Sequence, residues 1–305
     1  MPQIKWAFFV QLVFGAHALR WHLLLAKYSD FTAQNQVIGI FDSGYGGLSI
    51  LKDLRVALPE ADFLYLGDNA RSPYGNRSFD TVFRYTWQGV QQLFDWGCPL
   101  VVLACNTSSA RALRNIQQNM LPLHAPDRRV LGVLRPAVEQ IGNHSLNGHV
   151  GILATEGTVK SQSYEIEMAK FYPHVKVTSL ACPMLVPLVE NGEWSGQGVE
   201  FFVRRYAEQL LALDPLIDTV LLGCTHYPHL MPVFRKFFPS HIKILGQGGL
   251  VAPSLVDYLK RHPEMKQRLS FNGETKFSST EVSETFRLTA ERIFGPVGDI
   301  VQLPW

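Results

Sequence analysis

The sequence of 305 residues has only four cysteines, and no two of them form a C-x-x-C pair. Four thiols are too few to cross-link a chain of this length, and they lack the short paired spacing of structural zinc sites. We therefore expect a reducing compartment in which the thiols stay free. Cys98 and Cys182 each precede a proline in apolar surroundings and are interpreted as small buried hydrophobic residues.

The sequence also has little charge and no basic cluster. Charged residues make up 18% of the chain, and the formal net charge is +2. Without a basic patch to contact phosphates, nucleic acid is not expected as a partner. The glycine-rich stretch DSGYGG (42–47) fits neither G-x-x-x-x-G-K nor G-x-G-x-x-G. Because no lysine lies in a recognisable pyridoxal-phosphate setting and no cluster of metal ligands is evident, we expect neither cofactor nor metal.

Long hydrophobic runs are lacking as well. The stretch WAFFVQLVFGAHAL (6–19) superficially matches a secretory signal, but it is shorter than the about 20 residues of a membrane span. Arg20, His22 and Lys27 follow it closely. We interpret residues 1–36 as an N-terminal extension outside the main fold, and no membrane association is expected.

From Gln36 onward, apolar runs of strand length alternate with helical stretches. In chain order these are VIGIF (37–41), LSILKDLRVAL (48–58), DFLYLG (62–67), SFDTVFRYTWQGVQQLFDWG (78–97) and LVVLAC (100–105). The strand-like runs are continuously apolar, as in strands covered on both faces, so the pattern predicts an α/β fold with a doubly wound parallel sheet.

The chain also repeats itself. VIGIFDSGYGG, beginning at Val37, resembles HVGILATEGTVKS, beginning at His149, and VVLACNT (101–107) resembles VLLGCTH (220–226) in the same order. We therefore predict two pseudo-symmetric doubly wound lobes whose parallel sheets face a central cleft. The first lobe would comprise 37–134 and 247–305, and the second 135–246.

Both remaining cysteines directly follow predicted strands. Strand carboxyl ends face the ligand crevice of open α/β sheets, so Cys105 and Cys224 are expected on opposite sides of one cleft. A helix N-terminus behind Cys105 would lower its pKa from about 8.5. If one thiolate removes a proton from carbon while the other thiol protonates the far face, the stereocentre inverts. Asp42 and His226 could orient or deprotonate the neighbouring thiols.

Other interpretations of these residues stay open. Cys105, Cys224 and His226 could bind a zinc ion, although their spacing does not favour it. A Cys-His hydrolase could use either thiol as its nucleophile, but it would leave the second thiol without a role. Either cysteine alone could simply be a buried structural residue.

Long segments of the sequence resemble the glutamate racemase family, within the aspartate/glutamate racemase superfamily. The matching segments are GIFDSGYGGLSILKDL (39–54), YLGDNARSPYGNRS (65–78), LACNTSSA (103–110), ATEGTVKSQSY (154–164), LACPMLVPLVENG (180–192) and LLGCTHYPHL (221–230). They occur in the family's order, and with the intervening spacing they cover nearly all of 37–305.

The resemblance implies cofactor-independent, two-base racemisation of glutamate, with Cys105 and Cys224 as the proton carriers. Asp42, His226 and Glu190 match assisting positions in the family. Substrate-binding positions are matched by Asp42, Ser43, Tyr74, Gly75, Asn106, Thr107, Thr225 and His226, and Thr155 and Thr158 are further candidates. Hydroxyls, an amide and glycine N–H groups suit a doubly anionic substrate.

Further expectations follow from the resemblance. D-glutamate would supply bacterial peptidoglycan synthesis, which implies a cytoplasmic enzyme, and a homodimer is compatible with the family. Rival interpretations are a racemase of another substrate such as aspartate, and a binding protein acting on a partner such as DNA gyrase. GQGGLVAP (246–253) replaces an Asp/Ser-Gly-like segment that the family pattern would lead us to expect. Arg135 lies in a region that varies within the family, and it could either face the substrate or be only a residue of the crossover between lobes.

Overall fold

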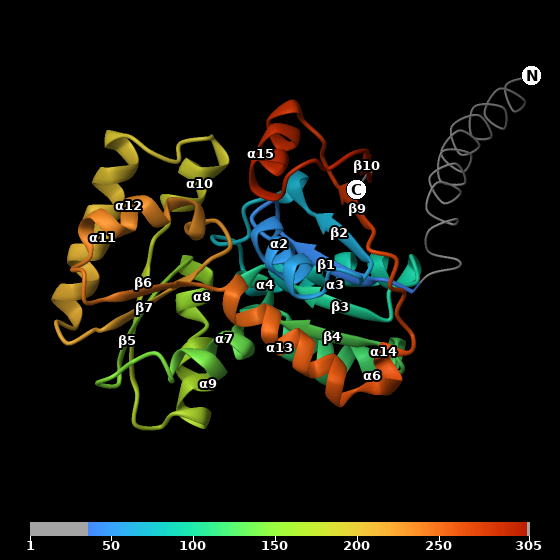
Figure 1. Ribbon diagram of the computed structural model, residues 1–305, viewed down its shortest axis with the longest axis horizontal. Helices are drawn as coiled ribbons and strands as arrows, with labels where there is room; N and C mark the ends of the chain where they lie inside the picture. The colour runs from blue at the N-terminus through green and yellow to red at the C-terminus, as the bar shows by residue number, and fades with distance from the viewer. Residues whose placement is uncertain (1–35, 304–305) are drawn as a thin grey trace, which may run out of the picture.

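A computed structural model describes residues 36–303 of the chain and shows an α/β fold built on two parallel sheets. Figure 1 shows the first sheet at the right and the second at the left. The first sheet has six strands, in the order β10-β9-β2-β1-β3-β4, and the second has four, in the order β6-β5-β7-β8. Every strand pair in both sheets is parallel. The predicted fold class is confirmed.

The bounds of the strands are β1 (Ile38–Asp42), β2 (Phe63–Gly67), β3 (Leu100–Leu103), β4 (Arg129–Gly132), β5 (His149–Ala154), β6 (Lys176–Ala181), β7 (Thr219–Gly223), β8 (Lys243–Gly246), β9 (Thr275–Ser279) and β10 (Ile300–Gln302). The order β2-β1-β3-β4 in the first sheet corresponds to β6-β5-β7-β8 in the second. The two halves of the chain therefore repeat one strand arrangement, and β9 and β10 extend the first sheet beyond β2.

Helices cover both sheets. Those of the first half are α2 (Leu48–Ala57), η1 (Asn69–Arg71), α3 (Phe79–Asp95), α4 (Asn106–Arg111), α5 (Leu113–Asn115), η2 (Ile116–Met120), α6 (Leu121–His124) and α7 (Leu134–Ile141). Those that follow are α8 (Glu156–Lys160), α9 (Ser163–Phe171), α10 (Leu185–Glu190), α11 (Gln197–Leu213), η3 (Tyr227–Leu230), α12 (Met231–Phe237), α13 (Gly248–Arg261), α14 (Pro263–Lys266) and α15 (Glu284–Phe294).

The central strands owe their position to burial on both faces. Every residue of β1, β2, β3 and β7 is buried, which explains their continuous apolar sequences. Helix α3 packs against β1 of the first sheet closely enough that a Cβ on its Gly89 would lie 2.1 Å from the Phe41 ring. Its first turn is capped by Ser78, whose side chain accepts a hydrogen bond from the Thr81 N–H.

The chain passes from the first sheet to the second between β4 and β5, and it returns after β8 through α13. Helix α13 contacts α2 from the first half and α7 from the crossover. The predicted lobe boundaries stay a prediction, and residues 1–35 of the predicted N-terminal extension lie outside the described residues. Between residues 36 and 303, no helix is long and apolar enough to cross a membrane.

Candidate active site

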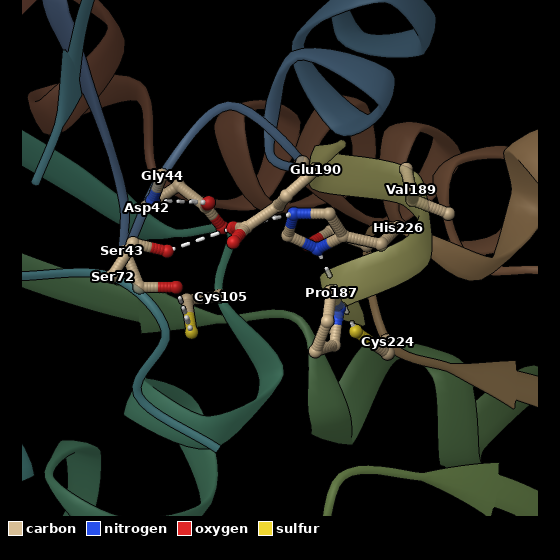
Figure 2. A network of polar contacts seen from close by, with 12 residues as sticks. Asp42, Ser43, Gly44, Ser72, Cys105, Pro187, Val189, Glu190, Cys224 and His226 are labelled. Atoms are coloured by element: carbon tan, nitrogen blue, oxygen red, sulfur yellow. Dashed lines mark hydrogen bonds and ion pairs between the residues drawn. The ribbon is translucent and has the colours of Figure 1, made fainter. Parts of the chain in front are cut away.

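Polar side chains from both sheets meet where the strands end. Figure 2 shows Cys105 and Cys224 on the two sides of a polar network, with Glu190 and Asp42 directed toward each other between them. Cys105 follows β3, and Cys224 follows β7, the corresponding strand of the second sheet. Both thiols are only 5% exposed. The repeat seen in the sequence thus brings the two cysteines to one site.

Cys105 lies in a hydrogen-bonded pocket of the first lobe. Its thiol donates to the Ser43 hydroxyl at 3.3 Å, and its sulfur accepts from the Ser108 N–H at 3.4 Å as the cap of α4. Burial raises the pKa of Cys105 to about 11, and the nearby Asp42 carboxylate adds to the rise, while these two serines oppose it. The lowered pKa expected from the helix N-terminus is therefore wrong, because desolvation outweighs it.

Cys224 has an imidazole and a carboxylate behind it instead. His226 Nδ1 lies 3.8 Å from the Cys224 sulfur. On the other side of the ring, Nε2 lies 3.3 Å from Glu190 Oε1, as an ion pair without the geometry of a full hydrogen bond. The Ser72 hydroxyl donates to the same Glu190 oxygen at 2.8 Å. Ser72 follows η1, which comes directly after β2 of the first sheet. This chain of contacts therefore joins both halves of the molecule.

These contacts set the charges of His226 and Glu190. Burial alone would lower the pKa of His226, but the Cys224 sulfur and the Glu190 carboxylate raise it to about 10, so the ring is an imidazolium at neutral pH. Burial raises the pKa of Glu190, but the opposing effect of His226 and the Ser72 hydroxyl is larger, so the pKa lies below its usual value. Glu190 is therefore ionised beside a charged histidine.

Asp42 is the third charged group of the site and is fully buried. Its Oδ2 accepts from the Gly44 N–H at 2.9 Å, whereas its Oδ1 has no hydrogen-bond partner. Burial raises the pKa of Asp42 to about 6, against the opposing charge of His226. A buried carboxylate oxygen without a donor costs free energy, so this oxygen is available to a positively charged ligand group.

Two glycines let the loops of the two sheets approach each other. A Cβ on Gly46 would lie 2.4 Å from Thr225 Oγ1 and 2.6 Å from the His226 ring, which any larger residue would have to displace. A Cβ on Gly75 would lie 2.9 Å from the Thr155 side chain. The Gly75 carbonyl also accepts from the Gly157 N–H at 2.8 Å. Gly46 and the predicted binding residue Gly75 are therefore required by close packing between the lobes.

The other predicted binding residues also gather here. Asn106, Thr107 and Thr225 are all buried beside the two cysteines. Thr107 Oγ1 lies 2.9 Å from the Thr155 hydroxyl and 3.5 Å from that of Thr158. The structure therefore places hydroxyl groups from both lobes in contact near Cys105.

Two predicted positions have other partners. The hydroxyl of Tyr74 donates to Asp68. Arg135 forms an ion pair with Glu139 at 2.8 Å, and its side chain is 65% exposed. Arg135 lines a cavity of about 1240 Å³, and none of the five predicted catalytic residues lines this cavity. Arg135 is thus a residue of the crossover helix α7 and does not contact the paired cysteines.

Ser72 and Gln247 contact site residues but were not singled out from the sequence. Nothing in the local sequence around Ser72 indicates its partner Glu190, whereas Gln247 lies in the stretch that departs from the family pattern. Among the described residues, no group of three or more His, Cys, Asp or Glu side chains could hold a metal ion. Within residues 36–303, the structure therefore shows no set of ligands for the zinc ion considered from the sequence.

Comparisons with known proteins agree with this arrangement. The family profile described as Asp/Glu/Hydantoin racemase matches residues 53–245. A glutamate racemase from Roseobacter denitrificans is 42% identical over 239 residues, which cover 75% of this chain and 87% of that protein.

Solved structures give the same result. A glutamate racemase isoform from Bacillus anthracis superposes with a TM-score of 0.79 at 32% identity, covering 88% of this chain and 97% of that one. The glutamate racemase from Francisella tularensis, solved in complex with D-glutamate, has a TM-score of 0.77 at 31% identity with the same coverage. The chain belongs to the glutamate racemase family of isomerases, within the Asp/Glu/Hydantoin racemases.

Proposed function

We propose that this chain interconverts L- and D-glutamate by proton transfer at Cα between two thiols, without a cofactor. The observation that carries the proposal is the pair of buried cysteines at corresponding strand ends of two repeated sheets, Cys105 after β3 and Cys224 after β7. Proton donors on opposite faces of one carbon are what inversion requires. A hydrolase with a single nucleophile would not need the second thiol.

The surroundings of the two thiols suit opposite roles. With a pKa near 11, Cys105 is a thiol at neutral pH and can donate a proton. At the other side, the proton on His226 is available to the Cys224 sulfur. In one direction, Cys224 as a thiolate takes the α-proton, and Cys105 gives its proton to the opposite face of the carbanion. The reverse transfers return the other enantiomer.

Carbanion formation needs stabilisation by the protein. The unpartnered Asp42 Oδ1 can accept from the substrate ammonium group, and the Asn106 amide and the Thr107 and Thr225 hydroxyls can donate to its carboxylates. Because both thiols are 5% exposed, substrate can reach them only if the two lobes separate. Closure then excludes water from the reacting carbon.

The remaining parts of the proposal rest on the family resemblance. They are the preference for glutamate over aspartate, the supply of D-glutamate to peptidoglycan synthesis, a cytoplasmic location and a homodimer. A binding role toward another protein is the rival from a different class, and the paired thiols favour catalysis over it.

Proton NMR in D₂O tests the proposal. Purified protein is expected to remove the α-proton signal of L-glutamate and of D-glutamate, and to bring each to an equal mixture of enantiomers. Aspartate under the same conditions is the comparison substrate. Turnover of aspartate alone would make the substrate assignment wrong, and exchange of neither amino acid would make the enzyme assignment wrong.

We expect Ser72→Ala to lower kcat about tenfold, because a hydrogen bond to a charged group contributes about 1.5–3 kcal/mol. The pKa of Glu190 should rise once the Ser72 hydroxyl is lost, and carbon-13 NMR of the Glu190 carboxyl group measures that rise directly. L- and D-glutamate have equal free energy in water, so kcat/KM must fall by the same factor in both directions. Ser254→Ala is the control, since that hydroxyl donates only within helix α13. An unchanged pKa of Glu190 in Ser72→Ala would contradict this coupling.

A further inference from the structure

Three buried side chains form a closed ring of hydrogen bonds beside Cys105. The Tyr164 hydroxyl donates to Asn106 Oδ1 at 2.9 Å, and Asn106 Nδ2 donates to Gln247 Oε1. Gln247 Nε2 completes the ring by donating to the Tyr164 oxygen at 2.7 Å. Each group donates to the next, and all three residues are at most 2% exposed. Such a cyclic arrangement strengthens each bond and fixes the direction of all three.

The ring brings together three distant segments of the chain. Asn106 is the first residue of α4, directly after Cys105, and Tyr164 lies in α9 of the second half. Gln247 lies between β8 and α13, where the chain returns to the first sheet. This glutamine stands in the stretch that departs from the family pattern. The ring therefore closes only when these segments of the two halves are in contact.

The ring determines how the Asn106 amide is oriented. With Oδ1 accepting from Tyr164 and one N–H given to Gln247, the amide has one N–H left. An unrestrained amide could rotate by half a turn and present its oxygen to an anion, which would repel it. A restrained amide offers only a donor, which suits a carboxylate.

We propose that Gln247 is a positioning residue for the racemisation reaction: through the ring with Tyr164, it holds the Asn106 amide with an N–H directed to a substrate carboxylate. The inference rests on the proposed function, because it assumes an anionic amino acid beside Cys105. A ring that served only packing would affect stability, whereas a positioning ring affects catalysis through Asn106.

The test uses variants that break the ring without leaving a large cavity. Gln247→Met keeps the length of the side chain, and Tyr164→Phe keeps the aromatic ring. Each is expected to lower kcat/KM for glutamate about 10- to 100-fold. Because the three groups act as a unit, the double variant should be little worse than either single one. In an Asn106→Ala background, Gln247→Met should change kcat/KM by less than twofold, while any effect on the melting temperature remains.

Gln117→Met is the matched control, because Gln117 donates to the Val130 carbonyl away from the cysteines and should leave kcat/KM unchanged. An active wild type whose kcat/KM is unaffected by Gln247→Met overturns the inference. The inference is also overturned if Gln247→Met lowers kcat/KM by the same factor in the Asn106→Ala background as in the wild type. Absence of glutamate turnover in the wild type overturns the proposed function together with this inference, and is recognised by measuring the wild type first.

Discussion

Cys105→Ala and Cys224→Ala should each lose racemisation but keep exchange of one enantiomer, and the two variants should exchange opposite enantiomers. A single remaining thiolate can still remove the α-proton that faces it and return a deuteron to the same face. Without a proton donor on the far side, the configuration is retained. Loss of a positioned acid or base typically lowers the rate about 10²- to 10⁴-fold, so racemisation should fall at least that much.

The measurement follows L- and D-glutamate separately in D₂O by proton NMR and by the ratio of enantiomers. Cys98→Ala is the control, since Cys98 is fully buried elsewhere in the first lobe and burial raises its pKa to about 12. It should keep racemisation and lose only some thermal stability. If both site variants exchanged the same enantiomer, or either racemised at the wild-type rate, the two-thiol mechanism would be wrong.

Much of the fold was predictable because its signals are local. Strands such as β1 and β3 are buried on both faces and therefore read as continuous apolar runs. Strand β9 (Thr275–Ser279) carries polar residues, and β10 (Ile300–Gln302) has three residues, so neither resembles the central strands. In the first sheet β9 pairs with β2 and β10 pairs with β9, and no local pattern indicates either pairing.

The site was predictable to the extent that its residues follow strands. Cys105, Cys224 and Asp42 were found because they stand at or just after the carboxyl ends of apolar runs. Ser72 and Gln247 were not, since their partners lie 118 and 141 residues away along the chain. The pKa of Cys105 was expected to fall, because sequence shows the adjoining helix but not the extent of burial.

Asp42→Asn should make the folded protein more stable at pH 8 while it disables the enzyme. The pKa of Asp42 is about 6 in the folded protein and 3.8 as its ordinary value, a difference that corresponds to about 3 kcal/mol. Because the folded state binds this proton more tightly, the wild type loses that stability as pH rises from about 4 to above 6. An asparagine stays neutral, and its side-chain oxygen can still accept from the Gly44 N–H.

The free energy of unfolding, measured for both proteins between pH 4.5 and 8, gives the direct comparison. The advantage of Asp42→Asn should grow with pH over this range, and kcat/KM should fall at least 100-fold because the ammonium group loses its anionic partner. Asp257→Asn, at an exposed ion pair with Arg261, should change neither quantity appreciably. A variant less stable than wild type at pH 8 would contradict the argument. The expected result means that the buried charge is retained for binding at the expense of stability.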